Sequence, residues 1–182
     1  KAVSFIAVVA RVAVDSHSFE DHKRGGLLIA SWDGASIFNS LMYNFRTRFH
    51  TGTHLDQLDL ILTLLIRLRR IGLFKKGDIR DYHLVSLKCC SPILPERGVQ
   101  FLLEWDPTSL LQTDDGRWLP LYRAAAQKSI REFQIVFGYG IRYYPYKKGI
   151  SLLFQKDAGI TPFQQACRKH GRDKVIHCVE ET

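Results

Sequence analysis

The fold is decided by a short stretch near the carboxyl end, GITPFQQA at residues 159–166. Glycine at its start suits a turn, because it adopts backbone conformations that other residues avoid. Pro162 suits the first position of a helix, since its fixed φ is already helical and its missing N–H would have had no partner there. Ala166 is small enough for a neighbouring helix to approach closely. The stretch therefore predicts a turn that leads into a closely packed helix.

Two similar arrangements occur upstream, LPLYRAA at residues 119–125 and YHLVSL at residues 82–87. Each is followed by a polar turn and a second apolar helix, and residues 83, 120 and 162 take matching places, 37 and 42 residues apart. One such unit is too small to bury its own apolar face, so the units must stack on one another. We therefore predict an all-α fold, a solenoid of helical repeats with long inter-repeat loops. The repeat-defining residues are Pro120, Leu121, Ala124, Thr161, Pro162, Phe163 and Ala166.

GITPFQQA resembles the ankyrin motif G-x-T-P-L-H-x-A, and DGRWLPLYRA at residues 115–124 resembles it with one residue more before its proline. Tyr122 and Gln164 stand where the family usually has histidine. The spacings exceed the ankyrin period of about 33 residues, and we place the excess in the loops. More widely, residues 26–33, 49–53, 101–107 and 139–142 are similar to a lineage-expanded family of divergent ankyrin-repeat proteins of microalgae. The resemblance implies protein binding, by analogy with ankyrin repeats in general.

Composition shifts divide the chain into residues 1–25, to which we assign no role, 26–77, a helical segment, and 78–182, about three repeats. The apolar residues 2–10 predict a buried helix or strand. A secretory signal is the alternative, but no small-residue cleavage site follows. The clearest helix spans 55–71 and stops at Gly72. Its two apolar stripes predict burial on both sides.

The chain carries a formal net charge of +8, which favours acidic partners, nucleic acid included. Its hydrophobic fraction of 46% predicts a packed core. No uncharged window approaches the roughly 18 residues of a membrane span, so we expect no membrane partner. The four cysteines form no CxxC pair, which indicates reduced thiols and a cytoplasmic or nuclear location.

Motifs that would indicate catalysis are missing from the sequence. His50 and His54 have the spacing of a zinc-protease helix, but Gly52 lies between them and no glutamate follows the first. Gly138-Tyr139-Gly140 is too short for a dinucleotide site and predicts a helix end. Cys167 and Cys178 are expected to fill space between helices. We predict no catalytic residue, no metal, no cofactor and no enzymatic activity.

Basic and aromatic side chains alternate in RYYPYKK at residues 142–148, which we place in a long loop between two repeats. The tyrosines either pack against Leu152, Leu153 and Phe154, which is the favoured interpretation, or they contact a partner. The candidate contact residues are Arg142, Tyr143, Tyr144, Tyr146, Lys147 and Lys148. The first functional hypothesis is a non-catalytic protein-interaction scaffold. The second, ranked below it, is a basic module that binds nucleic acid through this segment, because such residues stack on bases and neutralise phosphates.

Overall fold

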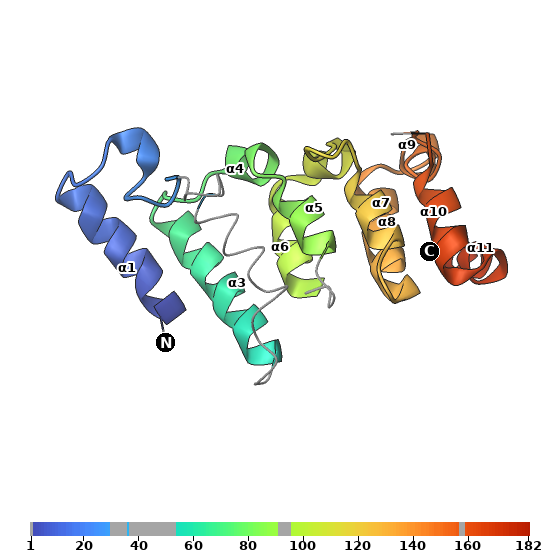
Figure 1. Cartoon of the computed structure of the whole chain (residues 1–182), viewed down its shortest axis with the longest axis horizontal. Coiled ribbons are helices and arrows are strands. Elements are labelled where there is room, and N and C mark those ends of the chain that lie inside the picture. Colours follow the sequence, from blue (N-terminus) through green and yellow to red (C-terminus); the bar gives the residue numbers. More distant parts are fainter. Residues whose placement is uncertain (1, 30–35, 37–53, 91–95, 157–158) are drawn as a thin grey trace. The chain divides into compact units, whose positions relative to one another are not determined.

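A computed structural model describes residues 2–29, 36, 54–90, 96–156 and 159–182, and every regular element in these ranges is a helix (Figure 1). The all-α prediction is confirmed for this part of the chain. The chain divides into two compact units, Lys1–Tyr82 and His83–Thr182. The predicted boundaries after residues 25 and 77 stay predictions. None of the helices in the described ranges is long and apolar enough to cross a membrane.

The first unit contains α1 (Ala2–Asp15), the 3-10 helix η1 (Asp21–Lys23), α3 (His54–Arg70) and α4 (Lys76–Asp81). Helices α1 and α3 pack against each other, and α1 buries two of its alanines. The prediction that the first apolar segment is buried is wrong for most of its large side chains. They are exposed because they lie on the face of α1 opposite to Ala7 and Ala10. These exposed residues are Phe5, Val8, Val9 and Val12.

Helix α3 ends as its sequence predicts. Gly72 has a φ of +75°, and its N–H donates to the carbonyl of Arg69 at 3.1 Å. The N–H of Leu73 donates to the carbonyl of Leu68 at 2.9 Å, so the last turn closes on itself. Both apolar stripes supply buried residues in the described part of the helix, which are Ile61, Leu64, Leu65 and Leu68.

The polar connection after α1 is tied to α4 by an ion pair. Arg24 pairs with the carboxylate of Asp78, whose side chain is buried. The same carboxylate accepts a hydrogen bond from the backbone N–H of Lys75 at 2.6 Å. Asp78 therefore caps the start of α4 and also connects this helix to Arg24 in the segment after α1.

The second unit contains α5 (Leu84–Cys89), α6 (Glu96–Trp105), the 3-10 helix η3 (Pro107–Leu111), α7 (Pro120–Ala125), α8 (Ile130–Tyr143), α9 (Lys147–Ser151), α10 (Pro162–His170) and α11 (Arg172–Glu180). Helix α5 packs on α6, α7 on α8, and α10 on α11. Helix α7 also packs against both α5 and α10, and α8 against α11. The short first helices of the three pairs are thus neighbours in chain order, as Figure 1 shows for this unit.

Proline and alanine take their predicted places in this unit. Pro120 and Pro162 are the first residues of α7 and α10, and Ala124 and Ala166 are fully buried. Thr161 adds a reciprocal cap, because its hydroxyl accepts from the N–H of Gln164 at 3.1 Å. Its own N–H donates to the Gln164 side chain at 3.0 Å. Leu121 is buried and Phe163 is half-buried.

Two predictions about the region of α8 are wrong. Gly138 and Gly140 do not end a helix, since α8 continues to Tyr143. Its buried stripe of Phe133, Val136 and Phe137 extends to Gly140, and a Cβ on that glycine would lie 2.9 Å from Leu152 Cδ1. Glycine thus serves close packing inside the helix instead of a turn. The segment 142–148 is consequently no long loop, because α8 covers its start and α9 begins at residue 147.

Candidate functional site

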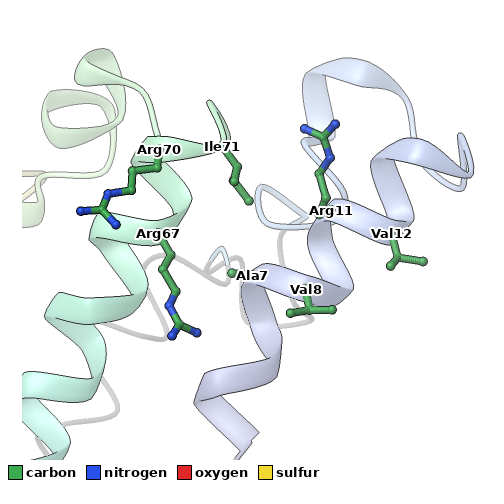
Figure 2. A pocket seen from close by; sticks show the side chains of 7 residues that line it. All are labelled: Ala7, Val8, Arg11, Val12, Arg67, Arg70 and Ile71. Atoms are coloured by element: carbon green, nitrogen blue, oxygen red, sulfur yellow. The ribbon is translucent and has the colours of Figure 1, made fainter.

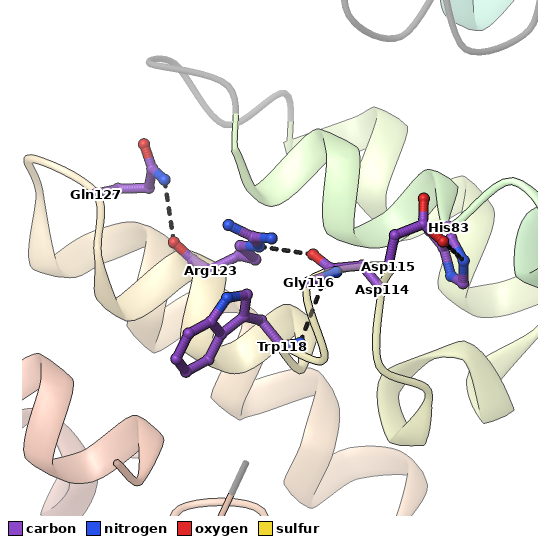
Figure 3. A network of polar contacts seen from close by, with 7 residues as sticks. All are labelled: His83, Asp114, Asp115, Gly116, Trp118, Arg123 and Gln127. Carbon is purple, nitrogen blue, oxygen red and sulfur yellow. Dashed lines mark hydrogen bonds and ion pairs between the residues drawn. The ribbon is translucent and has the colours of Figure 1, made fainter. Parts of the chain in front are cut away.

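The turn before α7 is organised by the carboxylate of Asp114 (Figure 3). Its Oδ1 accepts hydrogen bonds from the backbone N–H of Gly116 at 2.9 Å and of Trp118 at 3.0 Å. Its Oδ2 accepts a hydrogen bond from Arg123 Nε at 2.6 Å. The side chain of Asp114 is 12% exposed, so water competes little for these bonds. One carboxylate therefore fixes both the turn and the first turn of the helix after it.

Arg123 is the cation that balances this carboxylate. Burial by itself lowers the pKa of Arg123, but the hydrogen bond to Asp114 and nearby negative groups raise it, and the net shift is upward. The guanidinium therefore stays charged. The backbone carbonyl of Arg123 accepts a hydrogen bond from Gln127 Nε2 at 3.0 Å (Figure 3). Both ends of α7 are thus held by polar contacts.

Two aromatic rings lie beside this ion pair. The rings of Trp118 and Tyr122 stack with their centroids 3.9 Å apart and an interplanar angle of 17°. The hydroxyl of Tyr122 donates to Gln165 Oε1 on α10 at 3.4 Å. All of these side chains are half-buried, so each keeps some surface in contact with solvent. We call Trp118, Tyr122, Arg123 and Gln165 the aromatic patch.

The neighbouring Asp115 points to another element. Its Oδ1 lies 3.2 Å from Nε2 of His83, which precedes α5 with a φ of +48°. The Asp115 side chain is 97% exposed, so this contact contributes little stability. Adjacent aspartates in this turn thus have different roles, and only Asp114 organises the structure.

The predicted contact segment is divided by the structure. The guanidinium carbon of Arg142 lies 5.9 Å from the ring centroid of Tyr143, and the Lys148 ammonium lies 4.6 Å from that of Tyr144. Both tyrosines are half-buried, and burial followed by the charge of Asp106 raises the pKa of Tyr144. Cations of the same chain therefore already lie over two of the three rings.

Tyr146 differs from the other two tyrosines of this segment. Its side chain is 85% exposed, and its φ of +65° places it in a conformation that residues with a Cβ seldom adopt. Lys147 is also exposed and is the first residue of α9. Contact with a large partner surface is therefore most accessible at Tyr146 and Lys147.

Sequence reasoning missed the aromatic patch. The ankyrin-like stretch begins at residue 115 and so leaves out Asp114, although an aspartate two residues before a glycine is a known signal for a side-chain-capped turn. Trp118 and Tyr122 are only four residues apart, so their contact is local in sequence. The contact with Gln165 joins residues 43 apart and has no local signal.

The described residues give little support for a reactive cysteine or for a metal site. Burial raises the pKa of the Cys89, Cys167 and Cys178 thiols, which keeps them protonated at neutral pH. No three His, Cys, Asp or Glu side chains gather as metal ligands within the described ranges. His50 lies outside those ranges, as does the side chain of His54. The absence of catalysis, metal and cofactor stays a prediction.

Comparisons of the chain with models of protein families, with curated proteins and with solved structures find no match.

Proposed function

We propose that the protein is a non-catalytic interaction scaffold that binds another protein through the aromatic patch. The observation that carries this proposal is the stacked Trp118–Tyr122 pair, which Asp114 and Arg123 hold in place. Tryptophan, tyrosine and arginine dominate the binding energy of protein interfaces. Side chains that are already ordered lose less conformational entropy on binding. The patch therefore combines suitable residues with a fixed geometry.

We also propose that the second unit is a short ankyrin-like array. Its three helix pairs, the two helix-opening prolines and the full burial of Ala124 and Ala166 support this proposal. Repeat arrays bind partners along the surface that successive units share. The patch fits that mode, because Tyr122 on α7 bonds to Gln165 on α10 and so spans two consecutive pairs. With all four cysteines free, we further propose a cytoplasmic or nuclear protein.

Nucleic acid is the second candidate partner, supported by the net charge of +8 and the basic residues of 142–148. The geometry supports it less well. Base stacking needs accessible ring faces, and Arg142 and Lys148 lie over the rings of Tyr143 and Tyr144. Tyr146 is the remaining exposed ring of this segment.

Affinity capture from native lysate tests the proposal, with each lysate divided into untreated and nuclease-treated halves. The baits are the wild type, Trp118→Ser, Tyr146→Ser and the control Arg168→Ser, which changes an exposed side chain elsewhere on α10. We expect a defined set of proteins that survives nuclease and that Trp118→Ser no longer captures. Loss of the captured material on nuclease treatment would instead favour the nucleic-acid hypothesis. Capture that Trp118→Ser leaves unchanged would contradict the proposed surface.

A further inference from the structure

Helix α1 carries four large apolar side chains that the first unit does not bury. Phe5 is 63% exposed, Val8 56%, Val9 62% and Val12 60%. Their spacing of i, i+3, i+4 and i+7 places all of them on one face of the helix. We call these four residues the α1 stripe. A contiguous apolar surface of this kind marks an interaction site more often than scattered single residues do.

The stripe continues into a groove between α1 and α3. The groove has a volume of about 360 Å³, and Val8 and Val12 form its wall on the α1 side (Figure 2). Ala7 and Ile71 add further apolar surface. The volume is within the range of known binding sites, which are mostly apolar with a few polar groups.

Three arginines complete the lining of the groove, and none of the described side chains that line it is acidic (Figure 2). Arg11 extends from α1, and Arg67 and Arg70 extend from α3. Arg11 also pairs with Asp15 at 3.1 Å, but both side chains are more than half exposed. The guanidinium group binds carboxylates through two parallel hydrogen bonds. An apolar wall with three guanidinium groups thus suits an occupant that is apolar on one side and acidic beside it.

A second copy of this chain does not suit the site. Pairing of two such grooves would bring the same three arginines together, in a chain whose net charge is already +8. Close approach of like charges across an interface costs several kcal/mol. The charge therefore favours a different, acidic molecule over self-association.

We propose that the α1 stripe and this groove bind an acidic amphipathic helix of a partner protein. Phe5 and Val9 lie outside the groove lining, so a small ligand confined to the groove would leave both exposed. A helix with its own apolar positions at i, i+3, i+4 and i+7 covers the whole stripe and places flanking carboxylates near Arg67 and Arg70. The site lies in the first unit, so its failure and that of the aromatic patch are separately observable.

The probes are two synthetic peptides that a side-chain crosslink holds helical. Both have leucine at their own positions i, i+3, i+4 and i+7, which would face the α1 stripe. One has glutamate at the flanking positions and the other has lysine. Fluorescence anisotropy measures their binding to the full chain. We expect the acidic peptide to bind at least about tenfold more tightly than the basic one. Its affinity should fall as the salt concentration rises.

Matched variants locate the contact on the protein. Arg67→Gln with Arg70→Gln should weaken the acidic peptide about tenfold, whereas Arg168→Gln with Arg172→Gln, which removes the same charge from exposed positions of the second unit, should not. Phe5→Ser with Val9→Ser should also weaken the peptide. These side chains are exposed, so their loss should leave thermal unfolding unchanged, and circular dichroism checks this.

Three other occupants are tested in parallel, with decanoate as a small amphiphile, phosphatidylglycerol vesicles as a membrane, and sedimentation for self-association. Binding of decanoate or vesicles without binding of the acidic peptide would overturn the proposal. So would a dimer that Val8→Asp dissociates. Equal affinity for the acidic and basic peptides, or an acidic peptide unaffected by Arg67→Gln with Arg70→Gln, would overturn it as well.

Discussion

Arg123 Nε lies 2.6 Å from Asp114 Oδ2, and this ion pair connects the turn before α7 to the helix itself. The other oxygen of the carboxylate accepts two backbone N–H groups of the turn. The stacking of Trp118 on Tyr122 depends on this arrangement, because Trp118 belongs to the turn and Tyr122 to the helix. The ion pair therefore connects the two segments that carry the stacked rings.

Replacement of Asp114 should destabilise the second unit. Asp114→Ala removes three hydrogen bonds to a charged group and leaves the Arg123 guanidinium unpaired, so we expect a loss of about 2–3 kcal/mol in the free energy of unfolding. Asp115→Ala is the matched control, and its 97% exposure predicts a change within about 0.5 kcal/mol. Urea unfolding monitored by tryptophan fluorescence measures both. Equal effects of the two variants would refute this role of Asp114.

Enlargement of Ala166 tests the packing of α10 against α7. Its side chain is fully buried, and α10 packs against α7, so Ala166→Leu should overpack the interior of this unit and cost about 1–3 kcal/mol. Arg168→Leu adds a leucine at an exposed position of the same helix and should leave the melting temperature nearly unchanged. A melting temperature that does not fall for Ala166→Leu would mean that the assigned repeat register is wrong.

The tyrosines of 142–148 should separate into two classes. Tyr144 is half-buried beneath the Lys148 ammonium, and Tyr144→Ser should cost about 1–2 kcal/mol from lost burial and the lost cation–π contact. Tyr146 is 85% exposed, so Tyr146→Ser should leave thermal unfolding unchanged and affect only partner binding. Differential scanning fluorimetry compares the two. Similar melting temperatures for both variants would contradict the division of this segment.

Buried Lys88 should make stability depend on pH. Burial lowers the pKa of Lys88 to about 8 from 10.5. Between these values the unfolded chain binds more protons than the native protein, so stability rises with pH. Lys88 should contribute an increase of about 1 kcal/mol in the free energy of unfolding from pH 7 to pH 9.

The thiol of Cys89 also affects stability in this pH range. The effect of Lys88 is therefore measured as the difference between Lys88→Met and the wild type. Burial raises the pKa of Cys89 above its usual 9.0, so Cys89 lowers stability as pH rises through that value. Lys88→Met retains the thiol and removes the buried charge. We expect the difference in unfolding free energy between Lys88→Met and the wild type to shrink from pH 7 to pH 9. A difference that is constant across this range would refute the assignment to Lys88.

The features that the sequence predicted correctly are those with local causes. Pro120, Pro162 and Gly72 act through their own backbone preferences, and the structure places all three at the predicted helix ends. The wrong predictions involve long-range packing. A Cβ at position 140 would collide with Leu152, so the packing of α8 explains the glycine there, and no local pattern reveals this packing.

The two surfaces illustrate the same limit. The apolar composition of α1 predicted burial, but which face it buries depends on where α3 packs. The patch at Trp118 needs Gln165 from another helix pair. Tertiary contacts thus decide which side chains are available to a partner, and periodicity within one segment does not contain that information.

Site-specific photo-crosslinking tests the central claim most directly. A benzoylphenylalanine replaces Trp118 in the patch, Tyr146 on the contact segment, or the exposed Arg168 as a control, and each full chain is irradiated in nuclease-treated lysate. We predict a discrete protein adduct with the probe at position 118, which the control at position 168 does not form. An adduct at position 146 alone would move the contact to the 142–148 segment. No adduct at position 118, or the same adducts at positions 118 and 168, would contradict a protein-binding aromatic patch.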